Sequence, residues 1–208
     1  MKLSEYAAFD GLALAGLVKA GQVSARELAD TAQRAVDRLN GTLNAVIAPV
    51  PEETARTLRE GPGRGAFEGV PFLIKDIGSH YANVPSECGS RLFAGVTFPH
   101  DSELAARFKR AGLVAIGRSN IPEFGASVST ESIATGATRN PWNLSRTPAG
   151  SSGGAAVACA AGLGPIGIGT CAGGSTRIPA ACNGVVGFKQ SLGLIPHDMA
   201  PDTIALSG

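Results

Sequence analysis

Length, composition and charge limit the classes of protein to which this chain can belong. Its 208 residues, 44% of them hydrophobic and 17% charged, are enough to bury one substantial core, which predicts a single globular domain. A formal net charge of +1, with no run of lysines or arginines, excludes nucleic acid and anionic lipid as expected partners.

The first 60 residues predict mainly helices. A short helix is expected over Asp10–Lys19, and a capping box at Ser24–Glu27 opens an amphipathic helix that Asn40-Gly41 should end. A strand is expected over Ala45–Val50. Pro51, which two glutamates follow, then opens another helix with acidic side chains in its first turn.

The next segment alternates strands with a helix. Residues 61–65 form a loop rich in glycine, and Val70–Ile74 is a short apolar run typical of a buried strand that delivers Lys75 at its tip. Asp101 is expected to cap a helix, and Leu113–Ile116 should form the following strand. This alternation predicts an α/β fold.

The last third of the chain is poor in charge and rich in small residues. Residues 119–147 are polar and irregular, over a length that is typical of a functional loop. A helix of small residues is expected over Gly154–Ala161, with strands over Ile166–Ile168 and Val185–Phe188.

The N-terminus and the cysteines indicate a cytoplasmic protein without a metal or cofactor. Residues 1–5 lack the apolar core of a signal peptide, and no stretch reaches the roughly 18 apolar residues that a membrane span needs. The cysteines form no Cys-x-x-Cys pair and have no matching histidine pair. We therefore expect small core residues kept reduced, which are Cys88, Cys159, Cys171 and Cys182.

Two Gly/Ser clusters, at residues 150–154 and 169–175, are the strongest indication of chemistry. From the first cluster to residue 191 the only charged side chains are Arg177 and Lys189. Because glycines let the main chain approach a substrate, bare N–H groups beside a hydroxyl can form an oxyanion hole. The same clusters also fit flexible turns.

Two better-known glycine motifs do not fit their context. Gly150–Gly154 matches the nucleophile elbow, which would make Ser152 the nucleophile, but no strand precedes it and no acid lies between Ser152 and His197. Gly162–Gly167 matches a dinucleotide-binding fingerprint, yet it precedes a strand and contains Pro165. We interpret it as a helix-to-strand turn.

A lysine is the remaining candidate for the general base, because the three histidines have no matching acid in the sequence. Lys75 ends a buried strand, where desolvation lowers the pKa of an amine and lets it accept a proton near pH 7. Lys189 also follows an expected strand, but it has no serine-rich partner.

Three segments together resemble the amidase signature family. They are Gly69–Asp76, Gly150–Gly154 and Gly173–Ala180, and the resemblance includes the 24-residue spacing from Ser151 to Ser175 that is characteristic of that family. It implies a mixed-sheet α/β/α fold. Residues 1–208 would form the N-terminal part of the catalytic domain, including the helices of residues 1–60, with the C-terminal remainder absent.

The resemblance also implies roles for individual residues. Ser175 would be the nucleophile, Ser151, on an unusual cis peptide, would shuttle protons, and Lys75 would be the ultimate base. The oxyanion hole would consist of the N–H groups of Ala172, Gly173, Gly174 and Ser175. Four residues would surround this triad: Ser152, Thr170, Cys171 and Arg177.

The chain departs from the family pattern at three points, one of which is Gln190, where a proline is common. The family often has an acid where Cys171 stands, so Arg177 is expected to lack its usual partner, in a repacked surrounding. Cys171 can alternatively face the acyl pocket. The sequence also stops before the remaining strands and helices of the family, which predicts a fragment or one half of a split enzyme. The partner would then be a second copy, as a homodimer, or a complementing C-terminal fragment.

The expected function is hydrolysis of the C–N bond of a small amide, or of a carbamate, through an acyl-enzyme. Residues 69–76 and 136–148 look more like bacterial amidases that act on xenobiotic or nylon-type oligomeric amides than like transamidases. Two alternatives stay open. One is the glutaminase subunit of a tRNA-dependent amidotransferase, and the other is a truncated, non-catalytic binding module.

Overall fold

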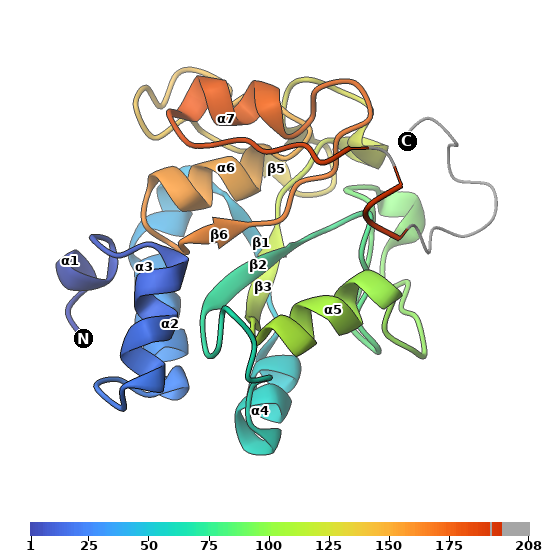
Figure 1. Ribbon diagram of the computed structural model, residues 1–208. Coiled ribbons are helices and arrows are strands. Elements are labelled where there is room, and N and C mark those ends of the chain that lie inside the picture. Colours follow the sequence, from blue (N-terminus) through green and yellow to red (C-terminus); the bar gives the residue numbers. More distant parts are fainter. Residues whose placement is uncertain (192, 197–208) are drawn as a thin grey trace.

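A mixed β-sheet lies at the centre of the computed structural model, which describes residues 1–191 and 193–196 (Figure 1). The sheet has the order β1-β3-β2-β6. Its strands are β1 (Val46–Pro49), β2 (Pro71–Lys75), β3 (Val114–Ser119) and β6 (Ile166–Gly167). The α/β class and the mixed sheet predicted from the sequence are both confirmed.

The central strands β2 and β3 position the residues discussed below. They run parallel, with Lys75 opposite Ser119, and every residue of both strands is buried. β6 also pairs parallel with β2, whereas β1 is antiparallel to β3. Near-continuous apolar runs are typical of strands buried on both faces, which explains why β2 could be predicted from its sequence.

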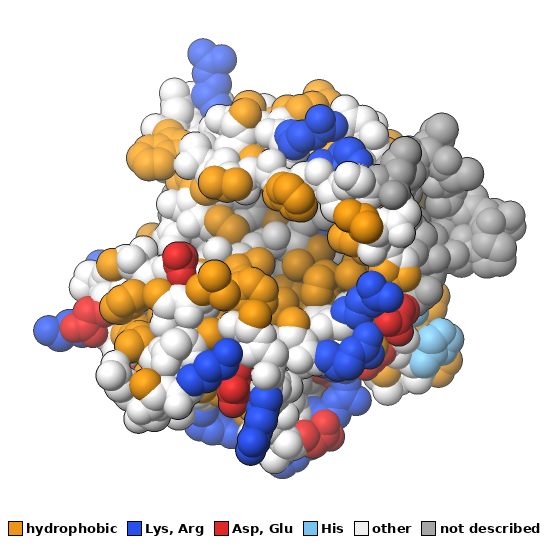
Figure 2. Space-filling model, viewed as in Figure 1, with side chains coloured by type: hydrophobic (Ala, Val, Ile, Leu, Met, Phe, Trp, Pro, Cys, Tyr) orange, Lys and Arg blue, Asp and Glu red, His pale blue; other side chains and the backbone are white. Residues whose placement is uncertain are grey.

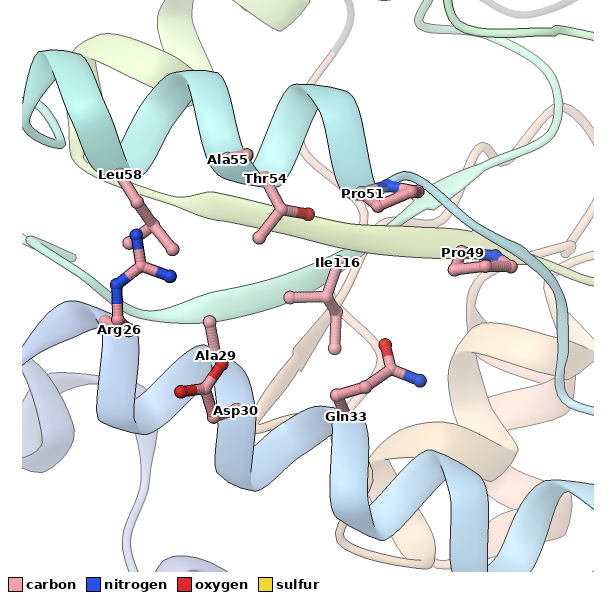
Figure 3. Close-up of a pocket in the computed structure, with 10 residues that line it drawn as sticks. All are labelled: Arg26, Ala29, Asp30, Gln33, Pro49, Pro51, Thr54, Ala55, Leu58 and Ile116. Carbon is pink, nitrogen blue, oxygen red and sulfur yellow. The ribbon is translucent and has the colours of Figure 1, made fainter.

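Four helices precede or surround the first strands. Both α3 and α4 pack against β3, and Figure 3 shows them lying side by side across the sheet. The N-caps of α2 and α3 are Asp10 and Ser24, whose side chains accept the N–H of Ala13 and of Glu27. The helices are α1 (Leu3–Tyr6), α2 (Gly11–Lys19), α3 (Ala25–Leu43) and α4 (Pro51–Glu60).

The later helices cover the rest of the sheet. In α5 (Glu103–Ala111), the ring of Phe108 packs edge-on against Phe72 of β2, with the ring centroids 5.7 Å apart. α6 (Gly153–Ala160) packs against β6 and α7 (Arg177–Asn183), and Figure 1 shows both helices on one side of the sheet. Short pieces complete the fold: η1 (Arg91–Phe93), η2 (Glu123–Gly125) and the hairpin of β4 (Glu131–Ser132) and β5 (Gly136–Ala137).

Two predicted helix boundaries are wrong. Helix α3 continues past Asn40-Gly41 and ends at Asn44, which adopts the left-handed conformation with φ of 48°. The Asn40 side chain does not break the helix, because its amide bonds the main chain of Ala45 and Val46 beyond the helix end. At α5 the N-cap is Ser102 instead of Asp101, whose carboxylate pairs with Lys109.

A predicted strand is also absent from the described residues. Val185–Phe188 forms no strand, and the side chains of Val186 and Phe188 are 97% and 80% exposed. An apolar run becomes a strand only where another strand pairs with it, and no described residue pairs with this one. Across the described residues, no helix has both the length and the apolar character that a membrane crossing requires.

Candidate active site

Lys75 lies at the end of β2 with its side chain fully buried. Its Nζ donates to the Oγ of Ser151 over 2.9 Å and to the Oγ1 of Thr170 over 2.6 Å. The fold therefore brings Lys75 together with two residues that lie 76 and 95 positions away in the chain. The sequence predicted all three as members or neighbours of one site.

Burial changes the acid–base chemistry of Lys75. Desolvation lowers the pKa of its ammonium group from 10.5 to about 7, although the nearby Cys171 acts in the opposite direction. A large fraction of this amine is therefore neutral near pH 7. A neutral amine 2.9 Å from a hydroxyl is in position to accept its proton.

Ser151 is held in a tightly packed environment. It follows a cis peptide bond between Gly150 and Ser151, and its side chain is buried. Glycines leave the space around it. A Cβ added to Gly125 would lie 3.4 Å from the Oγ of Ser151, and one added to Gly153 would lie 2.2 Å from the Oγ1 of Thr130. Thr130 in turn donates to the carbonyl of Ala149 over 2.8 Å.

Ser175 lies on the turn that precedes α7 and is half-buried. One backbone hydrogen bond joins the two Gly/Ser clusters. In it, the N–H of Ser152 donates to the carbonyl of Ser175 over 3.1 Å. In the part of the chain that the structure describes, no hydrogen bond joins the Ser175 hydroxyl to Ser151 or to Lys75. Lys75 is thus hydrogen-bonded directly to Ser151, whereas the bond between the two clusters involves only the main-chain carbonyl of Ser175.

The main chain before Ser175 exposes N–H groups. Ala172 and Gly173 are exposed, and within the described residues the N–H groups of Ala172, Gly173 and Ser175 have no acceptor. The N–H of Gly174 contributes to a lowered pKa of the Cys171 thiol. Gly174 has φ of +139°, and a Cβ there would lie 2.5 Å from the Cδ1 of Ile178, so this position requires glycine. Free N–H groups beside a serine hydroxyl can stabilise a developing oxyanion.

The residues expected around the triad have different contacts. Thr170 is hydrogen-bonded to Lys75, whereas the buried Oγ of Ser152 has no hydrogen-bond partner among the described residues. Arg177 was expected to lack its usual acidic partner, and its Nη2 lies 3.7 Å from the sulfur of Cys171.

A buried ion-pair network next to Lys75 was not predicted. The Nη1 of Arg118 lies 2.7 Å from Asp76, and its Nη2 lies 2.8 Å from Glu87. Asp76 also accepts the N–H groups of Glu87 and Gly89, so the network fixes the loop after Lys75 to β3. An arginine within the apolar strand sequence of residues 114–119 is the signal that could have revealed it.

The second glycine motif and His80 have other roles in the fold. Gly162–Gly167 is a turn from α6 to β6, as predicted. His80 stacks on Phe98 with the ring centroids 4.1 Å apart, and His197 lies outside the described residues. Among the described residues no cluster of His, Cys, Asp and Glu is suited to a metal ion, and the four cysteines are free.

A pocket elsewhere in the molecule is not the site. It lies between α3 and α4, where Arg26, Asp30 and Gln33 face Thr54 and Leu58 (Figure 3). None of the residues that line it belongs to the predicted site.

Comparison with known proteins finds one matching family and several similar sequences. Residues 27–204 match the model of the family described as Amidase. The 6-aminohexanoate-cyclic-dimer hydrolase of Paenarthrobacter ureafaciens is 42% identical over 205 residues, covering 96% of this chain and 41% of that protein. A glutamyl-tRNA(Gln) amidotransferase subunit of Thiobacillus denitrificans is 41% identical over 189 residues, covering 88% of this chain and 39% of that protein.

A solved structure agrees with these sequence relatives. A bacterial aryl acylamidase of the amidase signature family superposes with a TM-score of 0.85 at 31% identity, covering 93% of this chain and 42% of that one. The chain thus spans about two fifths of the length of the proteins it matches, 41% and 39% for the two curated relatives.

Proposed function

The chain belongs to the amidase signature family, and from this membership we propose that the protein that carries it hydrolyses C–N amide bonds, or the related carbamates. One observation carries the proposal. The Nζ of a fully buried lysine, with a pKa of about 7, lies 2.9 Å from the hydroxyl of Ser151. Burial of a lysine destabilises its charged form, and a pKa lowered this far supplies a base near neutral pH.

We propose the following reaction for these residues. Neutral Lys75 takes the proton of Ser151, and Ser151 takes the proton of Ser175, whose oxygen attacks the amide carbonyl carbon. The proton returns through Ser151 to the nitrogen of the departing amine, so that the C–N bond breaks and an ester to Ser175 remains. Water then attacks the carbonyl carbon of this ester, and one of its protons passes along the same relay to the Ser175 oxygen as the ester C–O bond breaks, which releases the carboxylic acid and restores the serine.

The free N–H groups before Ser175 support the oxyanion part of this proposal. Those of Ala172, Gly173 and Ser175 have no acceptor among the described residues, so they can bind the negative oxygen of the tetrahedral intermediate. Gly174 was expected to contribute as well. Its N–H contributes to the lowered pKa of the Cys171 thiol and is therefore not counted among these free groups.

For the substrate we propose a small linear or cyclic amide, including oligomeric and aryl amides. The support comes from the relatives, a cyclic-dimer hydrolase at 42% identity and an aryl acylamidase at a TM-score of 0.85. The second candidate is a glutaminase subunit, which the amidotransferase relative at 41% identity favours. A glutaminase would release ammonia from glutamine, and only together with a partner subunit.

We further propose that residues 1–208 form the N-terminal part of one catalytic domain, with the remaining part of the family fold as its partner. β6 is an edge strand with only two residues, Ile166 and Gly167. Figure 2 shows apolar side chains gathered across the middle of the face between α7 and α5. Val186 and Phe188 are also largely exposed. A complementing C-terminal segment would cover such surface, and a second copy is the alternative.

Free cysteines support a reducing compartment for this protein, so we propose that it acts in the cytoplasm. All four cysteines are unpaired in the described structure. Fractionation of cells that express the protein, with detection by antibody, tests the location directly; recovery outside the cytoplasm would refute it.

A fluorophosphonate probe tests the proposed nucleophile. It bonds covalently to activated serines, so we expect labelling of the peptide that contains Ser175, loss of labelling in Ser175→Ala, and unchanged labelling in the control Ser4→Ala, which alters an exposed serine. Absence of labelling in folded protein would favour the binding module.

Substrate assays separate the two enzymatic candidates. The proposed amidase releases aniline from simple aryl amides, or opens cyclic oligoamides, without a second subunit. Ammonia release from glutamine alone, and only after addition of amidotransferase partner subunits, would overturn the amidase assignment in favour of the glutaminase.

A further inference from the structure

The buried carboxylate of Asp76, the residue that follows the proposed base in the chain, accepts three hydrogen bonds. Its Oδ1 accepts the Nη1 of Arg118 over 2.7 Å and the N–H of Glu87 over 3.1 Å. Its Oδ2 accepts the N–H of Gly89 over 2.9 Å. The main-chain carbonyl of Asp76 also accepts the N–H of Cys88 over 3.1 Å. One residue at the end of β2 therefore holds three consecutive residues of a loop.

The same loop, residues 87–90, is bonded to η2, which packs on Ser151. The carbonyl of Cys88 accepts the N–H of Phe124 over 2.7 Å. A Cβ added to Gly125 would lie 3.4 Å from the Oγ of Ser151, so the main chain of η2 lies directly against this hydroxyl. The loop thus connects the carboxylate at the end of β2 to the surface that covers the second residue of the proposed relay.

Stability alone is a weak reason for burying this ion pair. Asp76 and Arg118 are 1% and 6% exposed, and the desolvation of two buried charges roughly offsets their mutual attraction. A pair of apolar side chains would fill the same space at similar free energy. An apolar side chain, however, cannot accept the two N–H groups of the loop. What the carboxylate adds is therefore a fixed orientation of the loop, as expected of residues that support an active site.

We propose that Asp76 is a positioning residue for the proton relay, an inference that rests on the proposed function. Its carboxylate holds the loop of residues 87–90, and this loop holds η2 against Ser151. The hydroxyl of Ser151 therefore stays 2.9 Å from the Nζ of Lys75. If η2 moved away, water would reach the buried amine, and the hydroxyl would no longer be confined beside it.

Amide hydrogen exchange in the 208-residue chain tests the connection without any substrate. Asp76→Asn keeps the shape of the side chain, but its amide nitrogen cannot accept a hydrogen bond, so at least one donor loses its acceptor. We expect exchange at Gly89 and Phe124 to become about tenfold faster, while the amides of β2 and β3 keep their protection.

A matched control is Glu53→Gln in α4, which alters another buried carboxylate with two cationic partners. It should leave exchange at Gly89 and Phe124 unchanged. Unaltered exchange at Phe124 in Asp76→Asn would overturn the proposal, and so would an equal rise in exchange throughout the sheet.

The titration of Lys75 shows whether the connection reaches the base. Its midpoint, followed by NMR of the ¹⁵N-labelled amine, should rise by about one pH unit in Asp76→Asn, because hydration of the amine favours its charged form. The loss of a negative charge beside Arg118 acts in the opposite direction, and Cys171, which raises the pKa of Lys75, is the same in both proteins. A midpoint that falls or stays unchanged would therefore overturn the positioning role.

A change at the surface provides a second variant, should Asp76→Asn not fold. The Oγ of Ser90 donates to the carboxylate of Glu123 over 2.6 Å, which is a second hydrogen bond between the loop and η2. Glu123→Ala removes this bond at an exposed position. We expect faster exchange at Phe124 and a smaller rise in the Lys75 midpoint. Faster exchange with an unchanged midpoint would show that η2 does not position the relay, and the proposal would be wrong.

The outcomes separate this inference from the proposed function. In folded protein, fluorophosphonate labelling of Ser175 should become about tenfold slower in Asp76→Asn and stay unchanged in Glu53→Gln. If Asp76→Asn is labelled as fast as the unmodified chain, the positioning role is wrong while the nucleophile assignment stands. If Lys75 of the unmodified chain titrates near its ordinary value of 10.5, the proposed function itself fails.

Discussion

The two sides of the proposed relay differ in how firmly the described residues hold them. On the side of the base, Lys75 and Ser151 are buried and joined directly by a hydrogen bond. On the side of the nucleophile, the turn at residues 171–176 is partly exposed, and one backbone hydrogen bond ties Ser175 to Ser152. The described residues therefore hold the Lys75 side chain by burial and hydrogen bonds, whereas they make few contacts that fix Ser175.

The residues on the side of the base are thus held more firmly than those on the side of the nucleophile. The base side is organised by β2, β3 and α6, which are packed against one another, so its geometry should survive in the isolated chain. The nucleophile side lies on a partly exposed turn that has fewer hydrogen bonds among the described residues. The following predictions test that contrast, beginning with the largest effect.

Removal of the base should have the largest effect. Lys75→Met keeps the length and the apolar stem of the side chain but cannot accept a proton, so we expect amide hydrolysis to fall by about 10³–10⁴-fold. Steady-state kinetics with an aryl amide measures this loss. Lys19→Met, which alters an exposed lysine at the end of α2, is the control. A loss of less than tenfold would show that another group accepts the proton.

Glycine substitutions on the two sides should change the free energy of unfolding by different amounts. A Cβ on Gly154 would lie 2.4 Å from the backbone nitrogen of Asn120, so Gly154→Ala should lower the free energy of unfolding by about 3 kcal/mol. Gly173 on the nucleophile turn has no atom within 4 Å of such a Cβ, and Gly173→Ala should leave stability nearly unchanged. Urea denaturation measures both. Equal destabilisation by the two changes would remove the contrast.

The stability of the chain should depend on pH through Lys75. Between its folded pKa of about 7 and its ordinary value of 10.5, the unfolded state binds a proton that the folded state lacks, so stability rises with pH. Lys75→Met removes this contribution. Its free energy of unfolding should therefore rise less steeply than that of the unmodified chain, by up to about 1.4 kcal/mol per pH unit. Parallel curves between pH 7 and 9 would contradict the lowered pKa.

The smallest expected effect concerns the orientation of the amine. Thr170→Val removes the hydroxyl that lies 2.6 Å from the Nζ of Lys75, and we expect about a tenfold fall in the rate of hydrolysis. Thr42→Val, at an exposed position of α3, is the matched control. An unchanged rate in Thr170→Val would show that Ser151 alone suffices to orient the amine.

Several features could be predicted from the sequence because they depend on local patterns. The buried strand before Lys75 and the capped starts of α2 and α3 follow from apolar runs and from N-cap side chains. The association of Lys75 with Ser151 could be expected only from the family motifs, because 76 residues separate them.

The errors share a dependence on distant contacts. Helix α7 was not expected, because it is short and contains Pro179. The apolar run at Val185–Phe188 was assigned to a strand without knowledge of its partner. The pair of Arg118 and Asp76 joins residues 42 positions apart, which no local pattern reveals.

The proposed proton relay requires that about half of the Lys75 amine be neutral near pH 7. NMR titration of the Nζ of Lys75, in chain labelled with ¹⁵N-lysine and assigned by comparison with Lys75→Met, measures this property without substrate or partner. The structure predicts a midpoint at a pH of about 7. A midpoint close to the ordinary value of 10.5 would mean that Lys75 remains an ammonium group, and it would contradict the proposed proton relay.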